Sequence, residues 1–139
     1  MKKRILLPVL LILSLLCLLT SCSGNKLPEG ITETQLLTQG RAVVTALNEE
    51  QWQQVYEQLR EDAQQTTSPE DIQSVGSAVF EKAGAFKSES DVLLTGQKLK
   101  SGEEYGTAVF YCKHEKDDVM YRIAFSTDME LIGLQVQKK

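Results

Sequence analysis

The first half of the chain carries apolar residues at the spacing of α-helices. One stripe recurs every three or four residues and holds Leu36, Leu37, Val43, Val44 and Leu47, with Gly40 among them. Just before this stripe, Thr32 and Gln35 form the Thr-x-x-Gln pattern of a capping box. We therefore expect a helix that begins after Thr32.

Two further helices are predicted, each with its own start signal. Residues 48–51 repeat the capping pattern, so we expect a bend near Asn48 and then a second helix, with an apolar face of Trp52, Val55, Tyr56 and Leu59. Ser68 before Pro69 is typical of an N-cap and first helical position, and Gly84 is placed to end that third helix. Its apolar face would carry Ile72, Val75, Val79 and Phe80. The polar residues 61–67 between these helices predict a loop.

After Phe86 the apolar period changes from 3.6 to two, which indicates β-strands. The pattern predicts four of them, at residues 91–100, 103–115, 118–126 and 129–137. The connections are short and rich in turn residues, so neighbouring strands must run antiparallel as a meander.

Turn positions also predict a strand register. Two-residue turns at 116–117 and 127–128 would pair Ile123 with both Phe110 and Ile132, and Tyr121 with Cys112 and Leu134. One face then collects the apolar side chains Phe110, Cys112, Val119, Tyr121, Ile123, Phe125, Ile132, Leu134 and Val136. In the first strand the alternation leaves two choices, because Val92 and Leu94 compete with Leu93 for this face.

Helices followed by an antiparallel sheet with one apolar face favour the α+β class. We expect three N-terminal helices packed on a curved four-stranded meander, forming a single domain over residues 31–139.

The first 22 residues predict export. Lys2, Lys3 and Arg4 precede an apolar stretch, residues 5–19, which as a helix would span about 22 Å at ~1.5 Å per residue. That is short of the roughly 30 Å hydrocarbon core of a bilayer, which favours a signal peptide over a permanent membrane helix.

The stretch ends in Leu-Thr-Ser-Cys, residues 19–22, which resembles the lipobox of bacterial lipoproteins. The resemblance implies cleavage before Cys22 and attachment of a diacylglycerol to its thiol. The alternative is an ordinary secretory peptide with a chance cysteine. We expect residues 1–21 to be a signal peptide, residues 22–30 a lipidated cysteine and tether, and the mature protein to lie on the extracytoplasmic face of a cell membrane.

The order of elements resembles a known family. Residues 84–86, Gly-Ala-Phe, close the last helix, and residues 125–134 form the last hairpin, as in the domain of unknown function 3887 family. That family comprises small bacterial lipoproteins and extracellular modules grouped with the nuclear transport factor 2-like superfamily. Over residues 31–137 the resemblance implies a cone-like fold, nuclear transport factor 2-like or cystatin-like, and carries over no catalytic residue.

Charge and length narrow the functional classes. The chain has 139 residues and a net charge of −4, and three of its 15 basic residues lie among the first four. The remainder has 12 basic and 19 acidic residues, or −7, and so lacks the basic face that nucleic-acid binding requires.

Candidate chemistry is sparse. Cys112 would be the single thiol of the mature domain besides Cys22, and we interpret it as a small buried hydrophobic residue. His114 is expected to be mostly exposed, about 7 Å from Cys112 along the strand, which is too far for a nucleophile–base pair. The acids of residues 115–118 lack the ligand spacing of a calcium loop. We therefore expect no catalytic residues, no cofactor and no metal.

Two functions remain open. The first is a non-enzymatic binding or interaction module, anchored by lipid, that contacts an envelope protein or a small ligand. Its predicted contact surface is the outer sheet face, with Val109, Tyr111, Met120 and Arg122. That face could instead be covered by the domain's own helix or tail. The alternative function is a small-molecule enzyme or carrier that uses the interior of the cone.

Overall fold

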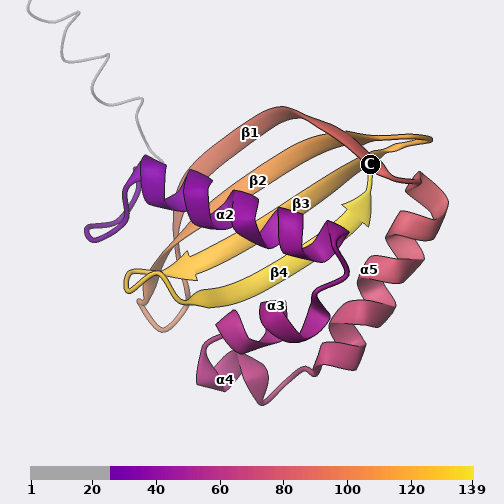
Figure 1. The fold of residues 1–139 in the computed structure, drawn as a ribbon. Coiled ribbons are helices and arrows are strands. Elements are labelled where there is room, and N and C mark those ends of the chain that lie inside the picture. The colour runs from indigo at the N-terminus through magenta and orange to yellow at the C-terminus, as the bar shows by residue number, and fades with distance from the viewer. Residues whose placement is uncertain (1–25) are drawn as a thin grey trace, which may run out of the picture.

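Residues 26–139 are described by a computed structural model, and they form a helical layer and an antiparallel sheet (Figure 1). The helices are α2 (Glu33–Asn48), α3 (Trp52–Gln58), α4 (Glu61–Gln64) and α5 (Pro69–Ala83). The strands are β1 (Phe86–Lys98), β2 (Glu104–His114), β3 (Asp118–Ser126) and β4 (Leu131–Lys138). The α+β class is confirmed. The prediction of three helices is wrong by one, because residues 61–64 form the short helix α4 instead of a loop.

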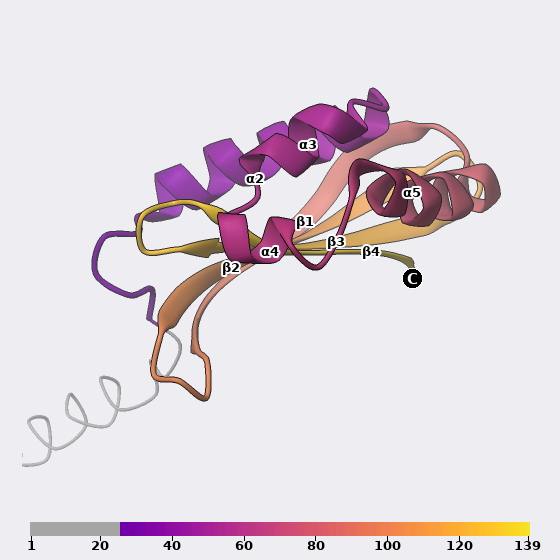
Figure 2. The ribbon, with the colours of Figure 1, turned by 90° about the horizontal axis from the view of Figure 1, so that it is seen from below.

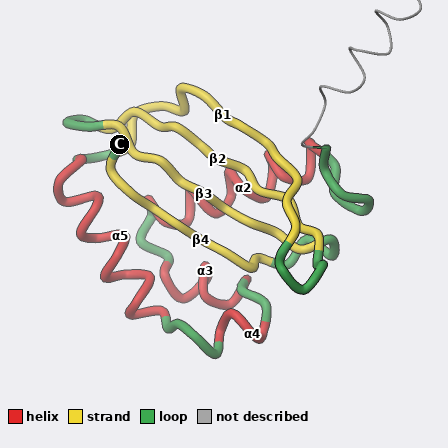
Figure 3. The backbone as a smooth tube through the Cα atoms, turned by 180° about the vertical axis from the view of Figure 1, so that it is seen from behind, coloured by secondary structure: helices red, strands yellow, loops and turns green. Residues whose placement is uncertain are grey.

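The four strands follow one another in the order β1-β2-β3-β4, and every neighbouring pair is antiparallel. Helix α2 lies across one face of this open sheet, while α3, α4 and α5 gather beside β4 (Figures 1 and 2). The opposite face carries no helix of residues 26–139 (Figure 3). The core therefore lies on one side of the sheet only.

Two of the three predicted helix starts are confirmed. Thr32 caps α2 through its side chain, which accepts from the Gln35 N–H, and Ser68 caps α5 by accepting from the Asp71 N–H. Gly84 ends α5 with a φ of 82°, a left-handed value that suits glycine. Asn48 does not cap α3, whose N-cap is Gln51 without a side-chain bond. Asn48 is instead the last residue of α2, although the bend predicted there is present.

The predicted strand register is wrong by two residues in both hairpins. Phe110 pairs with Tyr121, Cys112 with Val119, and Ile123 with Leu134. The first hairpin closes with the His114 N–H donating to the Asp117 carbonyl, so its turn lies nearer to β2 than expected. Because a shift of two residues keeps every side chain on its face, the predicted inner face survives for Phe110, Cys112, Val119, Tyr121, Ile123, Phe125 and Val136, all of which are buried.

An irregularity in β4 changes which of its residues face inward. Ala124 pairs with Gly133, but Phe125 pairs with Leu131, so Ile132 is an extra residue in the ladder. Leu131 is consequently buried, whereas Ile132 is half-buried at the edge of the sheet. In β1, Val92 and Leu94 pack against the core and Leu93 faces outward, which settles the choice left open by the alternation.

Helix α2 approaches the sheet closely through a glycine. A Cβ atom at Gly40 would lie 2.6 Å from the Phe110 ring, well inside normal contact. A second glycine, Gly76 of α5, is covered in the same way by the ring of Trp52, at 2.7 Å. Each aromatic ring therefore rests on helix backbone.

The segment before α2 is part of the packed domain. Leu27 packs against the core, Pro28 is buried, and the Pro28 carbonyl accepts from the Ile31 N–H. Lys26 lies on β1, where a Cβ atom at Gly96 would come within 2.0 Å of the Lys26 carbonyl oxygen. Of the tether predicted over residues 22–30, the part from Lys26 onward is thus held by the domain.

Candidate functional site

The predicted contact residues Val109, Tyr111, Met120 and Arg122 all lie on the outer sheet face. Val109 is only 2% exposed, so it adds little surface of its own. Tyr111 and Met120 are half-buried, with the Lys139 ammonium 5.0 Å from the centre of the Tyr111 ring, and Arg122 is exposed. That these residues contact a partner stays a prediction.

A different feature of residues 26–139 is an apolar hollow beside β4. It is a cleft of about 260 Å³ between β4, the α4–α5 connection and α5. Its walls are mainly aliphatic, and they include Leu47, Leu59, Ile72, Val75, Ile132, Leu134 and Val136. Val75 is 53% exposed at the rim of the cleft, although the helical pattern had placed it on the buried face of α5. The cleft therefore presents an apolar surface to solvent.

The cleft contains little that is charged. Asp71, in the first turn of α5, is the single ionisable side chain among its described lining residues. Ala63, Thr66 and Thr67 form the wall next to α4, and Gly76 leaves room in the wall formed by α5. The arrangement suits an apolar group better than a polar substrate.

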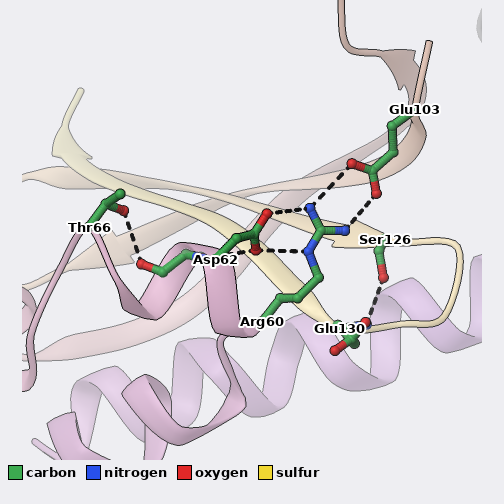
Figure 4. A network of polar contacts seen from close by, with 7 residues as sticks. Arg60, Asp62, Thr66, Glu103, Ser126 and Glu130 are labelled. Atoms are coloured by element: carbon green, nitrogen blue, oxygen red, sulfur yellow. Dashed lines mark hydrogen bonds and ion pairs between the residues drawn. The ribbon is translucent and has the colours of Figure 1, made fainter. Parts of the chain in front are cut away.

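Next to the cleft, a network of ion pairs fixes the connection between α3 and α4 (Figure 4). The Arg60 guanidinium donates to both oxygens of Asp62 at 2.9 Å, and to both oxygens of Glu103, at 2.6 and 3.2 Å. The hydrogen bonds from Arg60 hold the pKa of each carboxyl below its usual value. The Arg60 backbone N–H also donates to the Leu131 carbonyl at 2.8 Å. The network thereby ties the helices to β4 and to the β1–β2 turn.

The interior of the domain contains a second polar network, which the sequence did not predict. His114 was expected to be mostly exposed, but it is 6% exposed, because the Phe80 ring stacks on it and the Phe86 ring packs edge-on. Its Nδ1 lies 2.8 Å from the Gly84 carbonyl oxygen and its Nε2 lies 2.8 Å from the Tyr121 hydroxyl. The Asn48 amide donates to the same hydroxyl at 3.0 Å and to the Val44 carbonyl at 2.9 Å.

The partners of this network fix its proton positions. A carbonyl only accepts, so His114 must donate from Nδ1 to Gly84. Tyr121 accepts from Asn48 and then has Nε2 of His114 as the acceptor for its own proton. With these donors and acceptors every member is satisfied, in agreement with the absence of unpartnered buried side-chain polar atoms in residues 26–139. The network joins the ends of α2 and α5 to β2 and β3.

Two buried ionisable side chains, Cys112 and Tyr121, have raised pKa values. Cys112 is 1% exposed, and burial raises the pKa of its thiol to about 11. Burial likewise raises the pKa of Tyr121. Both groups are therefore neutral near pH 7, and the described residues contain no cluster of His, Cys, Asp or Glu suited to a metal ion.

The predicted lipidation site, Cys22, lies outside the described residues, as does the predicted signal peptide. Within residues 26–139 every helix is too short or too polar to cross a bilayer.

These features define a class of protein: a small α+β domain with helices on one face of an antiparallel meander and an apolar cleft at the sheet edge. The model of the family described as "Protein of unknown function (DUF3887)" matches residues 41–134, and the chain belongs to this family. The resemblance seen in the sequence is thus confirmed at the level of the family.

A solved structure has the same fold. The NMR structure of a protein from Ruminococcus gnavus ATCC 29149 matches with a TM-score of 0.68 and 24% sequence identity. The match covers 80% of this chain and 96% of that one. No curated protein matches the chain.

Proposed function

We propose that the protein is a non-enzymatic binding module, held by lipid on the extracytoplasmic face of a bacterial membrane, and that its cleft takes an apolar group. The observation that carries the binding role is the cleft itself, an apolar hollow open to solvent between β4 and α5. Apolar concave surfaces with few polar groups are the usual sites of ligand binding.

The alternative, an enzyme or carrier that uses the interior of a cone, has less support. We propose kinship with the nuclear transport factor 2-like superfamily because α2 lies across one face of the sheet. Between that helix and the sheet, however, the space is occupied by the wholly buried side chains of Phe110, Tyr121 and Phe125. An acid–base mechanism also needs two groups with separated pKa values in one pocket, and the cleft lining offers Asp71 alone.

The proposed anchor is Cys22, supported by the Leu-Thr-Ser-Cys sequence that follows a short apolar run. In the Cys22→Ala variant, fatty-acid labelling and retention in the membrane fraction should both be lost. Cys17→Ala is the matched control, because Cys17 lies inside the predicted signal peptide and should leave labelling unchanged. Undiminished labelling of the Cys22→Ala protein would show that the anchor is elsewhere.

The cleft is tested with a small apolar probe, toluene, added to the full chain in detergent and followed by methyl NMR. The methyl signals of Ile72, Val75 and Ile132 should shift, because these side chains line the cleft. Val75→Asp should remove the shifts at Ile72 and Ile132, whereas Leu93→Asp should not, since Leu93 is similarly exposed but lies on β1. If the methyl signals of the cleft residues do not shift when toluene is added, the proposed binding site is wrong.

A further inference from the structure

The cleft opens onto the free edge of β4. The Lys139 N–H donates to the Asp118 carbonyl at 2.9 Å. In an antiparallel ladder the backbone N–H and C=O groups of successive residues point alternately toward and away from the neighbouring strand. Counting back from Lys139, the backbone groups of Gln135 and Gly133 point toward β3, and those of Val136 and Leu134 point away from it. At the start of β4, the Leu131 carbonyl accepts a hydrogen bond from the Arg60 N–H. Within residues 26–139 no comparable partner is found for the N–H and C=O of Leu134.

Both sides of the β4 edge have room at Leu134. On the helical side lies the cleft of about 260 Å³, whose wall includes Gly133 and Leu134. On the outer side, the same two residues line a shallow hollow of about 280 Å³ together with Ala124, Arg122 and Gln135. Successive side chains of an extended strand point to opposite faces, so a strand beside Leu134 would find space for each of them.

The size and charge of the cleft identify the occupant. Pockets for small molecules usually measure about 300–1,000 Å³, so about 260 Å³ fits one or two aliphatic side chains better than a whole cofactor. The lining includes the carboxylate of Asp71 and no Lys or Arg. In the part of the chain described, Asp71 forms no salt bridge. A complementary ligand is therefore apolar with a positive charge at its end.

We propose that an extended peptide segment of a partner protein adds to β4 at Leu134, with an aliphatic side chain in the cleft and a basic residue beside Asp71. One peptide residue exchanges both backbone hydrogen bonds with Leu134, and its side chain enters the cleft on the side of the Leu134 side chain. The neighbouring peptide residues face the hollow near Arg122. This is recognition by strand addition, in which the backbone supplies affinity and alternate side chains supply specificity. The inference rests on the proposed function, because it names the ligand of the same cleft.

The test uses two synthetic peptides and the 15N-labelled full chain in detergent. The parent peptide is acetyl-Lys-Thr-Val-Thr-Val-Thr-Lys-amide, in which both valines face the same side of the strand. The matched peptide carries N-methyl groups on both valines, which removes the N–H groups that would pair with β4. The parent should shift the Leu134 amide signal, and the N-methylated peptide should bind at least tenfold more weakly.

Variants locate the bound peptide. Val75→Lys should weaken the parent peptide at least tenfold, because it places a positive charge at the rim of the cleft against the lysines of the peptide, whereas Leu93→Lys should leave its affinity unchanged. Asp71→Asn should also weaken it, and the loss should disappear for a peptide whose lysines are replaced by Ser.

Three outcomes would overturn the inference. Equal binding of the two peptides would mean that the cleft takes apolar groups without strand pairing, and the proposed function would stand. A parent peptide that fails to bind while toluene still shifts the cleft methyl signals would reject the peptide and keep the binding module. Failure of both probes would reject the proposed function as well.

Discussion

At the scale of single residues, Tyr121 holds the buried polar network together, since its hydroxyl serves both Asn48 and His114. Tyr121→Phe keeps the ring but leaves His114 Nε2 without a donor. An unpartnered buried polar group costs about 1–3 kcal/mol of unfolding free energy. We expect a loss of that size in urea denaturation, together with 15N shifts in the wild type that place the His114 proton on Nδ1.

Tyr105→Phe is the control for this variant, because the Tyr105 hydroxyl forms no hydrogen bond within residues 26–139 and the side chain is only half-buried. Its unfolding free energy should match that of the wild type. An equal loss in both variants would mean that the effect is not due to the network.

Cys112 provides a second prediction at this scale. Its thiol is 1% exposed and has a pKa raised to about 11, so little thiolate is present near pH 7. A thiol reagent should therefore label Cys112 slowly in the native protein and quickly in denaturant. The Cys17→Ala/Cys22→Ala double variant isolates this signal because Cys112 is then its single cysteine, and prompt labelling of its native form would contradict the burial of Cys112.

The sequence did not predict the burial or the hydrogen-bond partners of these polar residues. The Asn48 side chain, which matched a cap, donates to Val44 and Tyr121 instead. His114 was expected to be mostly exposed, but Phe80 and Phe86 cover it from elements about 30 residues earlier in the sequence. Local patterns do not indicate such long-range partners, although a histidine on the apolar face of a strand was a signal for burial.

At the scale of secondary-structure elements, the contact of α2 with the sheet depends on Gly40. Gly40→Ala should gain roughly 1 kcal/mol from helix propensity. The added Cβ would lie 2.6 Å from the Phe110 ring, and overpacking of a core typically costs about 1–3 kcal/mol. We expect the overpacking to prevail and the melting temperature to fall.

Thr38→Ala tests the effect of helix propensity without overpacking, because Thr38 is an exposed residue of the same helix. Its melting temperature should stay the same or rise. A Gly40→Ala protein that is also more stable would show that α2 can move away from Phe110.

The elements themselves were largely predictable, and the details of their pairing were not. The bounds of β3 were predicted correctly, as were the starts of α2 and α5, because periodicity and capping residues act locally. Alternation of apolar and polar residues predicts which face of the sheet a side chain occupies. It cannot detect a two-residue shift in strand pairing, because such a shift keeps the faces the same, and this is why the predicted partner of Phe110 is wrong. The extra residue Ile132 interrupts the alternation, so neither the burial of Leu131 nor the cleft at β4 followed from the pattern.

At the scale of the whole molecule, Arg60 connects the helical layer to the β1–β2 turn through Asp62 and Glu103. Both carboxyls have lowered pKa values in the folded state, so the unfolded state binds more protons as the pH falls. The stabilisation is complete above the unfolded pKa values, near 4, and is lost as the pH falls through the lower folded values.

We therefore expect the urea midpoint of the wild type to exceed that of Arg60→Met at pH 7, and the difference to shrink by pH 2.5. Arg41→Met is the control, because the Arg41–Glu89 pair joins α2 to β1, the edge strand opposite β4. A difference that is independent of pH would assign the role of Arg60 to packing instead of charge.

The contact of Lys26 with Gly96 sets how far the domain can move from its proposed anchor. With Lys26 held against β1, even a fully extended chain from Cys22 to Lys26 would span only about 13 Å at ~3.3 Å per residue. If the domain is held by the proposed lipid anchor, so short a connection confines it to a thin layer above the bilayer. Partners in the same layer meet it at a high effective concentration, of millimolar order for short linkers. A weak interaction therefore suffices for a neighbour in the membrane, while a freely diffusing protein gains no such advantage.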